Sequence, residues 1–195
     1  MRTGKIERNT KETQIRLRLD IDGSGRSNID TGVGFLDHML TLFASHGRFD
    51  LDVTCKGDTQ VDDHHSVEDI GIALGSAFAQ ALGSKAGCTR YGYMILPMDE
   101  ALMLTAVDLS GRAHLSFDAD LPAEQIGTFD TELVEEFWLA FVRNCPCSLH
   151  IRRLAGKNTH HIIEGIFKSA ARSFRQAAAI DGALEGEVPS TKGVL

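Results

Sequence analysis

Hydrophobic and polar residues follow two different periods in the first half of the chain. Residues 15–21 and 49–55 alternate between apolar and polar side chains, which predicts half-buried strands. Residues 34–45 carry apolar side chains at three- and four-residue spacing, which predicts an amphipathic helix, and Gly47 is suited to end it. A second helix, made mostly of small residues, is expected from about residue 66 to 82. The first half therefore combines a strand hairpin with further strands and helices.

The second half repeats this order of elements. We expect strands over residues 93–97, 101–109, 113–117 and 149–154, and helices over 131–142 and 159–179. Apolar positions again alternate in the strands and recur every three or four residues in the helices. An α+β fold follows, because each half is predicted to contain both kinds of element.

Two copies of a His-His-x-x-Glu motif occupy matching places in the two halves. His64 follows His38 by 26 residues (64 − 38), and His160 follows Glu136 by 24 residues (160 − 136). His38 and Glu136 each lie on the first predicted helix of their half. An internal repeat this close indicates two pseudo-symmetric half-domains packed together. We expect the first half-domain over residues 1–86, the second over 87–180, and a C-terminal tail over 181–195.

The residue types and spacing of these motifs predict metal binding. Residues four apart share a helix face, so the first histidine and the glutamate of each motif can hold one ion. Adjacent residues are about 100° apart on a helix, so the second histidine points elsewhere. We therefore expect two sites with exchanged ligands, assembled within one chain or between subunits. One would comprise His38, His64, Glu68 and His161, and the other His65, Glu136, His160 and Glu164.

Mixed imidazole and carboxylate ligands suit Mn, Fe, Zn or Co and do not choose among them. In one alternative, the histidines are solvated helix starts and the glutamates complete capping boxes. A dinuclear metallohydrolase would use the same ligand types. A ferritin-like storage protein is disfavoured, because its motif is reversed and its helices are long. The remaining histidines (His46, His114 and His150) and Cys145-Pro146-Cys147 are expected to be structural.

The composition mainly excludes certain partners and locations of the protein. A chain of 195 residues suits one domain or two small fused halves, and its net charge of −7 argues against a nucleic-acid partner. Residues 1–13 lack the apolar core of a signal peptide, and the longest uncharged stretch, residues 71–84, is too short to span a bilayer. We therefore expect no membrane partner, a cytoplasmic location and reduced cysteines.

Longer motifs extend along nearly the whole chain. They comprise TKET (residues 10–13), GVGFLDHM (32–39), SHG (45–47), DDHH with ED (62–69), DLSGR (108–112), LAGKN (154–158), HHIIE (160–164) and PSTKG (189–193). Together they resemble the imidazoleglycerol-phosphate dehydratase family of histidine biosynthesis. The resemblance implies two similar α+β halves, in which mixed four-stranded sheets pack against a central helix layer.

The resemblance also implies an assembly and a cofactor. It predicts a 24-subunit homo-oligomer with active sites between subunits, and two Mn²⁺ ions in each active site, with other divalent transition metals also suitable. The other partner would be a small phosphorylated imidazole substrate.

The resemblance assigns further site residues. The phosphate-binding residues of the family fall on Arg90, Arg112, Ser190 and Lys192. Glu12 becomes a contact to the glycerol hydroxyls of the substrate, and Asp99 a further catalytic candidate. Many members have His where this chain has Glu136, a carboxylate that could coordinate Mn²⁺ or leave the place to water or substrate. Trp138 replaces a usual Phe and is expected to affect packing alone.

The implied reaction removes water from D-erythro-imidazole glycerol phosphate and yields imidazole acetol phosphate without a redox cofactor. The proton on the glycerol carbon is not acidic, so direct removal would be slow. Our hypothesis is that metal ions stabilise an imidazolate, which expels the hydroxyl through a diazafulvene-like intermediate. Glu164 and Glu12 are the candidates for the acid and base steps, in an order that the sequence leaves open.

Overall fold

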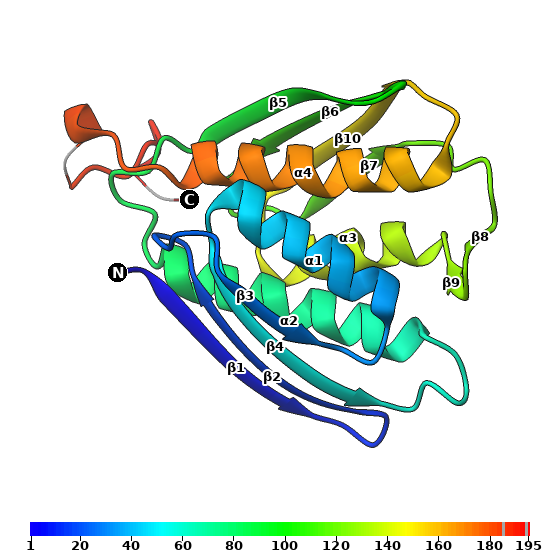
Figure 1. Cartoon of the computed structure of the whole chain (residues 1–195). Coiled ribbons are helices and arrows are strands. Elements are labelled where there is room, and N and C mark those ends of the chain that lie inside the picture. The colour runs from blue at the N-terminus through cyan, green and yellow to red at the C-terminus, as the bar shows by residue number, and fades with distance from the viewer. Residues whose placement is uncertain (185, 194) are drawn as a thin grey trace.

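A layer of helices separates two sheets. In the computed structural model, which describes residues 1–184, 186–193 and 195, four helices lie between two four-stranded sheets (Figure 1). The first half comprises β1 (Thr3–Asn9), β2 (Thr13–Asp20), β3 (Ser27–Asp30), α1 (Gly34–Gly47), β4 (Asp50–Gly57) and α2 (His64–Leu82). The second half comprises β5 (Tyr91–Met98), β6 (Ala101–Asp108), β7 (His114–Asp118), α3 (Leu133–Asn144), β10 (Ser148–Ala155) and α4 (Thr159–Ala178). This arrangement confirms the predicted α+β fold.

The two sheets have the same topology. Their strand orders are β1-β2-β4-β3 and β5-β6-β10-β7, and in each sheet only the last pair is parallel. The same order and the same directions in both halves are what an internal duplication produces. The second half differs by an inserted hairpin of β8 (Gln125–Ile126) and β9 (Phe129–Asp130), which the sequence pattern did not predict.

A glycine in the edge strand β1, and another in the edge strand β5, lets each of these strands approach a helix backbone. A Cβ atom on Gly4 of β1 would overlap the carbonyl oxygen of Ala77 in α2, and one on Gly92 of β5 would overlap that of Ser173 in α4. The strand positions differ by 88 (92 − 4) and the helix positions by 96 (173 − 77). The close contact is therefore repeated in both halves.

Next to this contact, a glutamine side chain accepts a backbone hydrogen bond from β1 in one half and from β5 in the other. The backbone N–H of Lys5 donates to Oε1 of Gln80 at 3.1 Å, and that of Tyr93 donates to Oε1 of Gln176 at 3.0 Å. These residues follow the same offsets of 88 and 96. An edge strand leaves backbone N–H groups without a partner, and here one of them is satisfied by a side chain from the helix layer.

One aromatic core joins the halves. Phe43 of α1, Phe78 of α2, Trp138 and Phe141 of α3, and Phe174 of α4 are all fully buried. Trp138 stacks on Phe174, with ring centroids 6.4 Å apart and an interplanar angle of 7°. The half-domains thus share their apolar interior. Trp138 lies wholly within this core, in line with the expectation that it affects packing.

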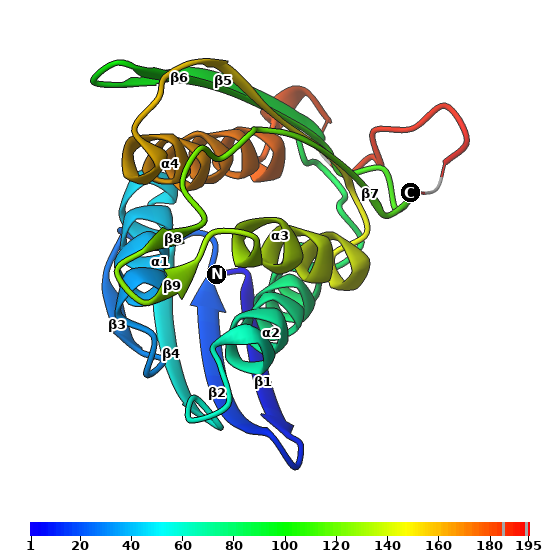
Figure 2. The same ribbon diagram turned by 90° about the vertical axis from the view of Figure 1, so that its right-hand side faces the viewer.

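The helices of both halves begin at the same end of the molecule, beside the β8–β9 hairpin, and Figure 2 looks onto this end. The C-terminal tail lies at the opposite end (Figure 1). Helix α2 begins at His64, two residues earlier than predicted, so both histidine pairs lie in the first turn of their helices. Within the described residues, no helix is both long and apolar enough to cross a membrane.

Candidate metal centre and its surroundings

His38, His160 and Glu164 converge on one point at the end of the molecule where the helices begin. Oε2 of Glu164 lies 3.3 Å from Nε2 of His160 and 3.6 Å from Nε2 of His38. All three ligand atoms lie within 4.8 Å of one another. Two atoms that bind one ion from about 2.1 Å each are about 3–3.5 Å apart. The cluster therefore fits a divalent ion both in its geometry and in its donor types.

Helix packing across the two halves creates this cluster. Helix α1 of the first half packs against α4 of the second, and α2 packs against α3. Gly71 and Gly75 of α2 allow the second contact, because they lie against the carbonyl oxygens of Phe137 and Phe141. His38 consequently meets the motif of the other half, which is about 120 residues away in the sequence.

Neither expected set of ligands is assembled within the described part of one chain. His38 was expected beside His64 and Glu68, yet it contacts residues assigned to the other ion. His64 Nε2 lies 3.8 Å from Glu68 Oε2, as predicted for residues four apart on a helix. Glu136 is half-buried near the start of α3 and joins no cluster of three ligand atoms among the described residues.

The second histidine of each motif points away from the first, as helix geometry predicts. His65 Nε2 lies 3.8 Å from Oε1 of Glu12 in the β1–β2 turn. His161 Nε2 lies 3.7 Å from Oδ2 of Asp99 in the β5–β6 turn. The structure therefore places the two hairpin carboxylates, both predicted site residues, beside equivalent histidines.

The Nδ1 atoms of these two histidines contact other carboxylates. His65 Nδ1 lies 3.0 Å from Asp58 Oδ2, and His161 Nδ1 lies 2.7 Å from Glu100 Oε2. The sequence reasoning did not identify Asp58 or Glu100 as site residues. A signal existed for Glu100, because it directly precedes β6 as Glu12 precedes β2.

The helix N-termini are capped outside the motifs. The Asn158 side chain accepts hydrogen bonds from the backbone N–H groups of His160 (3.0 Å) and His161 (3.4 Å). Oδ1 of Asp62, which occupies the equivalent place (158 − 96), accepts from the backbone N–H of His64 at 2.8 Å. A capping box requires its glutamate three residues after the N-cap residue, and with Asn158 as N-cap that position is His161. The interpretation in which Glu164 completes a capping box is therefore wrong for α4.

Charge around Glu164 keeps this carboxylate ionised. Burial would raise the pKa of Glu164, but the hydrogen bond and charge of Lys168, with smaller effects of His38 and His160, lower it overall. Lys168 Nζ lies 2.5 Å from Oε1 of Glu164. Oε2 of Glu164 remains directed toward the two histidines, which is the state that a metal ligand requires.

Carboxylate contacts also raise the pKa values of His65 and His161. The hydrogen bond with Asp58 raises the pKa of His65, and that with Glu100 raises the pKa of His161. In turn, the hydrogen bonds from His161 and from the backbone of Asn158 lower the pKa of Glu100 to about 2. A carboxylate at Nδ1 thus raises the pKa of both histidines.

The predicted phosphate-binding residues lie at the other end of α4. Arg90 donates its backbone N–H to the carbonyl of Ala177 near the end of this helix, whereas His160 lies in its first turn. A helix of 20 residues is about 30 Å long. Within one chain, the candidate metal-binding cluster and the predicted phosphate-binding residues therefore lie far apart.

The tail docks near the two predicted arginines. Nη1 of Arg90 donates to the carbonyl of Pro189 at 2.8 Å, and its Nε donates to Oδ1 of Asp108 at 2.7 Å. Leu195 lies against Gly111, next to Arg112. Ser190 and Lys192 lie between these two contacts in the chain, so the structure gathers the four predicted phosphate-binding residues at one end.

Comparison with known proteins identifies the family. A family model described as imidazoleglycerol-phosphate dehydratase matches residues 31–174. The imidazoleglycerol-phosphate dehydratase of Desulforamulus reducens is 57% identical over 194 residues, which cover 100% of this chain and 98% of that protein. The one from Acetivibrio thermocellus is 56% identical over 191 residues, which cover 98% of this chain and 97% of that protein.

Solved structures agree with the sequence relatives. The dehydratase from Staphylococcus aureus is 44% identical, with a TM-score of 0.82, over 92% of this chain and 99% of that one. The one from Pyrococcus furiosus is 37% identical, with a TM-score of 0.84, over 97% of this chain and 100% of that one. Since these matches extend over nearly the full length at high identity, the chain belongs to the imidazoleglycerol-phosphate dehydratase family of hydro-lyases in histidine biosynthesis.

Proposed function

We propose that this protein catalyses a metal-dependent dehydration of D-erythro-imidazole glycerol phosphate to imidazole acetol phosphate. The convergence of His38, His160 and Glu164 supports the metal dependence, because three ligand atoms meet there and one of them belongs to a carboxylate whose pKa is lowered. Mn²⁺ is the proposed ion, since mixed imidazole and carboxylate donors suit it. We propose two such ions per active site, one for each His-His-x-x-Glu motif.

The ligands proposed for the two ions come from both motifs. His64 and Glu68 would contribute to one ion, and His160 and Glu164 to the other. His65 and His161 face away from these pairs within their own chain, so we propose that they serve ions completed by a neighbouring chain. Such ions would supply Lewis acidity toward the imidazole ring of the substrate.

We assign proton transfer to carboxylates that a bound substrate can reach. The side chain of Glu12 is 52% exposed and lies at a hairpin turn, where it can approach the glycerol part of a bound substrate. Asp99 lies in the β5–β6 turn of the other half, beside His161, and its side chain is 72% exposed. Glu164 is largely buried and tied to Lys168, which favours a role as ligand, with proton transfer as its second proposed role.

The separation within one chain supports an active site shared between chains. The cationic end, with Arg90, Arg112, Ser190 and Lys192, lies about 30 Å from the metal cluster along α4. A single phosphorylated imidazole cannot span that distance. We therefore propose that the phosphate-binding end of one chain meets the metal-binding end of another in a closed homo-oligomer of 24 subunits.

The direct test is incubation of the purified protein with Mn²⁺ and imidazole glycerol phosphate, with mass spectrometry of the products. We expect a ketone lighter than the substrate by one water, loss of activity after chelation, and recovery on addition of Mn²⁺. Release of inorganic phosphate, or hydrolysis of esters without an imidazole ring, would instead indicate a dinuclear hydrolase. Oxidation of added Fe²⁺ with formation of a mineral core would indicate storage.

A further inference from the structure

Glu100 is anchored so that one of its oxygens faces His161. Oε1 accepts backbone N–H groups from Lys157 at 3.2 Å and Asn158 at 2.8 Å, while Oε2 lies 2.7 Å from Nδ1 of His161. The carboxylate thereby links the β5–β6 turn, the loop before α4 and the first turn of that helix. An ionised carboxylate only accepts hydrogen bonds, so Nδ1 of His161 carries the hydrogen.

Asp58 provides the same contact in the first half. Its two oxygens lie 3.2 and 3.0 Å from Nδ1 of His65, and its carbonyl accepts the backbone N–H of Val61 at 2.8 Å. Asp58 lies in the loop between β4 and α2. Nδ1 of His65 therefore carries the hydrogen for the same reason.

The two carboxylates do not occupy equivalent positions in the duplicated chain. Glu100 corresponds to Glu12, because the offset of 88 that relates β2 to β6 also relates these residues (100 − 12). Yet Glu12 faces Nε2 of His65, whereas Glu100 faces Nδ1 of His161. The two halves thus reach the same Nδ1 contact from different positions, which inheritance from one ancestral half does not explain.

We propose that Asp58 and Glu100 are positioning residues that hold His65 and His161 as Nδ1–H tautomers with Nε2 directed outward as a ligand. A neutral imidazole has one N–H and one lone pair, so a hydrogen held at Nδ1 leaves the lone pair on Nε2. A carboxylate on the far nitrogen also fixes the ring orientation and strengthens the ligand. This inference rests on the proposed function, because it takes the two histidines as metal ligands.

Metal affinity measured without substrate tests this role. We expect Glu100→Gln and Asp58→Asn each to weaken Mn²⁺ binding by the full-length protein about 10- to 100-fold. The affinity is measured from the electron paramagnetic resonance signal of free Mn²⁺ during a titration. Glu100→Ala should weaken it further, because glutamine keeps an acceptor oxygen. The matched control is Glu7→Gln, whose exposed carboxylate contacts no histidine and should leave the affinity unchanged. Thermal unfolding of metal-free protein verifies that each variant is folded.

A double-mutant cycle separates positioning from general structural support. If Glu100 acts through His161, Glu100→Gln should produce no further loss of Mn²⁺ affinity in a His161→Ala background, and Asp58→Asn none in a His65→Ala background. If the loss of Mn²⁺ affinity in the double variant equals the product of the two single-variant losses, the proposal is overturned. A crystal structure with Mn²⁺ should also show Nε2 of both histidines bound, and ligation through Nδ1 would contradict it.

The outcomes distinguish this inference from the proposed function. Weakened Mn²⁺ binding in the variants of a protein that does not dehydrate imidazole glycerol phosphate would leave the positioning role intact and refute the function. Unchanged binding in the variants of an active, Mn²⁺-dependent enzyme would refute the positioning role alone. Failure of the unsubstituted protein to bind Mn²⁺ would overturn the positioning role directly.

Discussion

Glu164 meets three groups that carry or can carry positive charge. Lys168 contacts one of its oxygens, and His38 and His160 approach the other. Burial raises the pKa of a carboxylate, and nearby positive charge lowers it. The lysine therefore keeps Glu164 ionised and leaves its other oxygen to the histidines.

Replacement of Glu164 by glutamine tests this residue. We expect Glu164→Gln to lower Mn²⁺ content and to reduce turnover by at least 100-fold, because a neutral amide is a weak ligand and cannot accept a proton from carbon. Turnover and metal content are measured on the same sample. Unchanged turnover in a metal-loaded variant would contradict both proposed roles of the carboxylate.

Glu136 differs in chemistry from its equivalent in the first half, His38. We expect Glu136→Ala to weaken Mn²⁺ binding about 10-fold and Glu136→His to restore it, since imidazole and carboxylate are both suitable ligands. Isothermal titration of the metal-free protein provides the measurement. Equal affinity of the alanine variant and the unsubstituted protein would show that Glu136 leaves its place to water or substrate.

At the scale of elements, the repeated glycine contacts determine how closely each sheet approaches the helices. We expect Gly4→Ala and Gly92→Ala each to reduce the free energy of unfolding by about 1–3 kcal/mol, because a methyl group would overlap a helix carbonyl. Urea denaturation measures the change. Gly182→Ala is the control, since a Cβ there meets no heavy atom of the described residues within 4 Å. A neutral Gly92→Ala would mean that β5 can shift away from α4.

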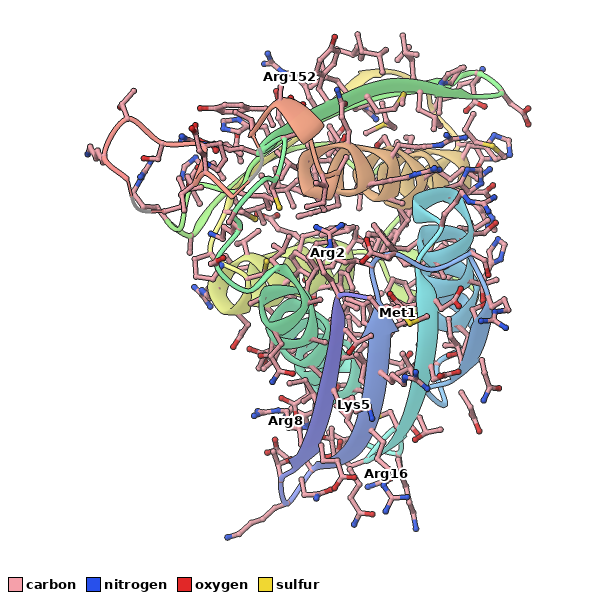
Figure 3. The ribbon with its side chains drawn as sticks, turned by 90° about the vertical axis from the view of Figure 1, so that its left-hand side faces the viewer. Met1, Arg2, Lys5, Arg8, Arg16 and Arg152 are labelled. Carbon is pink, nitrogen blue, oxygen red and sulfur yellow. The ribbon has the colours of Figure 1, made fainter. Side chains whose placement is uncertain are left out.

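Arg2 lies between the two halves (Figure 3). Its Nη1 donates to the carbonyl of Ala178 in α4 at 2.6 Å, and its Nη2 donates to Oδ1 of Asp22 at 2.6 Å. The hydrogen bond from Arg2 is the largest cause of the lowered pKa of Asp22. A lowered pKa in the folded state stabilises the fold above the ordinary value of 3.8, and the contribution is lost as pH falls below it.

We therefore expect Arg2→Met to destabilise the protein by about 1 kcal/mol or less at pH 7, with the loss shrinking toward pH 3. The estimate is small because Asp22 is partly exposed and solvent screens the pair. Urea denaturation at both pH values gives the difference. Arg16→Met, whose side chain is exposed and lies 3.9 Å from Glu7, should show almost no change at either pH. A loss that grows toward pH 3 would exclude this linkage.

At the scale of the whole molecule, if the two ends of α4 belong to different active sites, two inactive variants should complement each other in one assembly. His160→Ala removes a proposed metal ligand at one end, and Arg112→Ala removes a predicted phosphate contact at the other. Each variant alone should be inactive. When both are co-assembled at random, roughly a quarter of the sites should join two intact ends and regain turnover. A mixture that stays inactive after verified co-assembly would place the complete site within a single chain.

Much of the fold follows from local pattern. Alternating residues predicted β2 and β4, and three- to four-residue spacing predicted the helices, because these periods state which side of an element is buried. The short strand β3 and the β8–β9 hairpin had too few residues to show a period. Predicted and observed boundaries differ by up to two residues, and α2, for example, begins at His64 rather than at residue 66.

The duplication follows from the spacing between motifs along the chain, and the separate directions of the two histidines in each motif follow from their spacing on a helix. The contacts of His38 with Glu164 and of Glu100 with His161 join distant parts of the sequence and became evident only in the folded chain. Only the tertiary structure decided that the predicted phosphate-binding residues lie far from the metal cluster. Local periodicity states that a face is buried, but contacts between residues far apart in the chain depend on which helix packs against which.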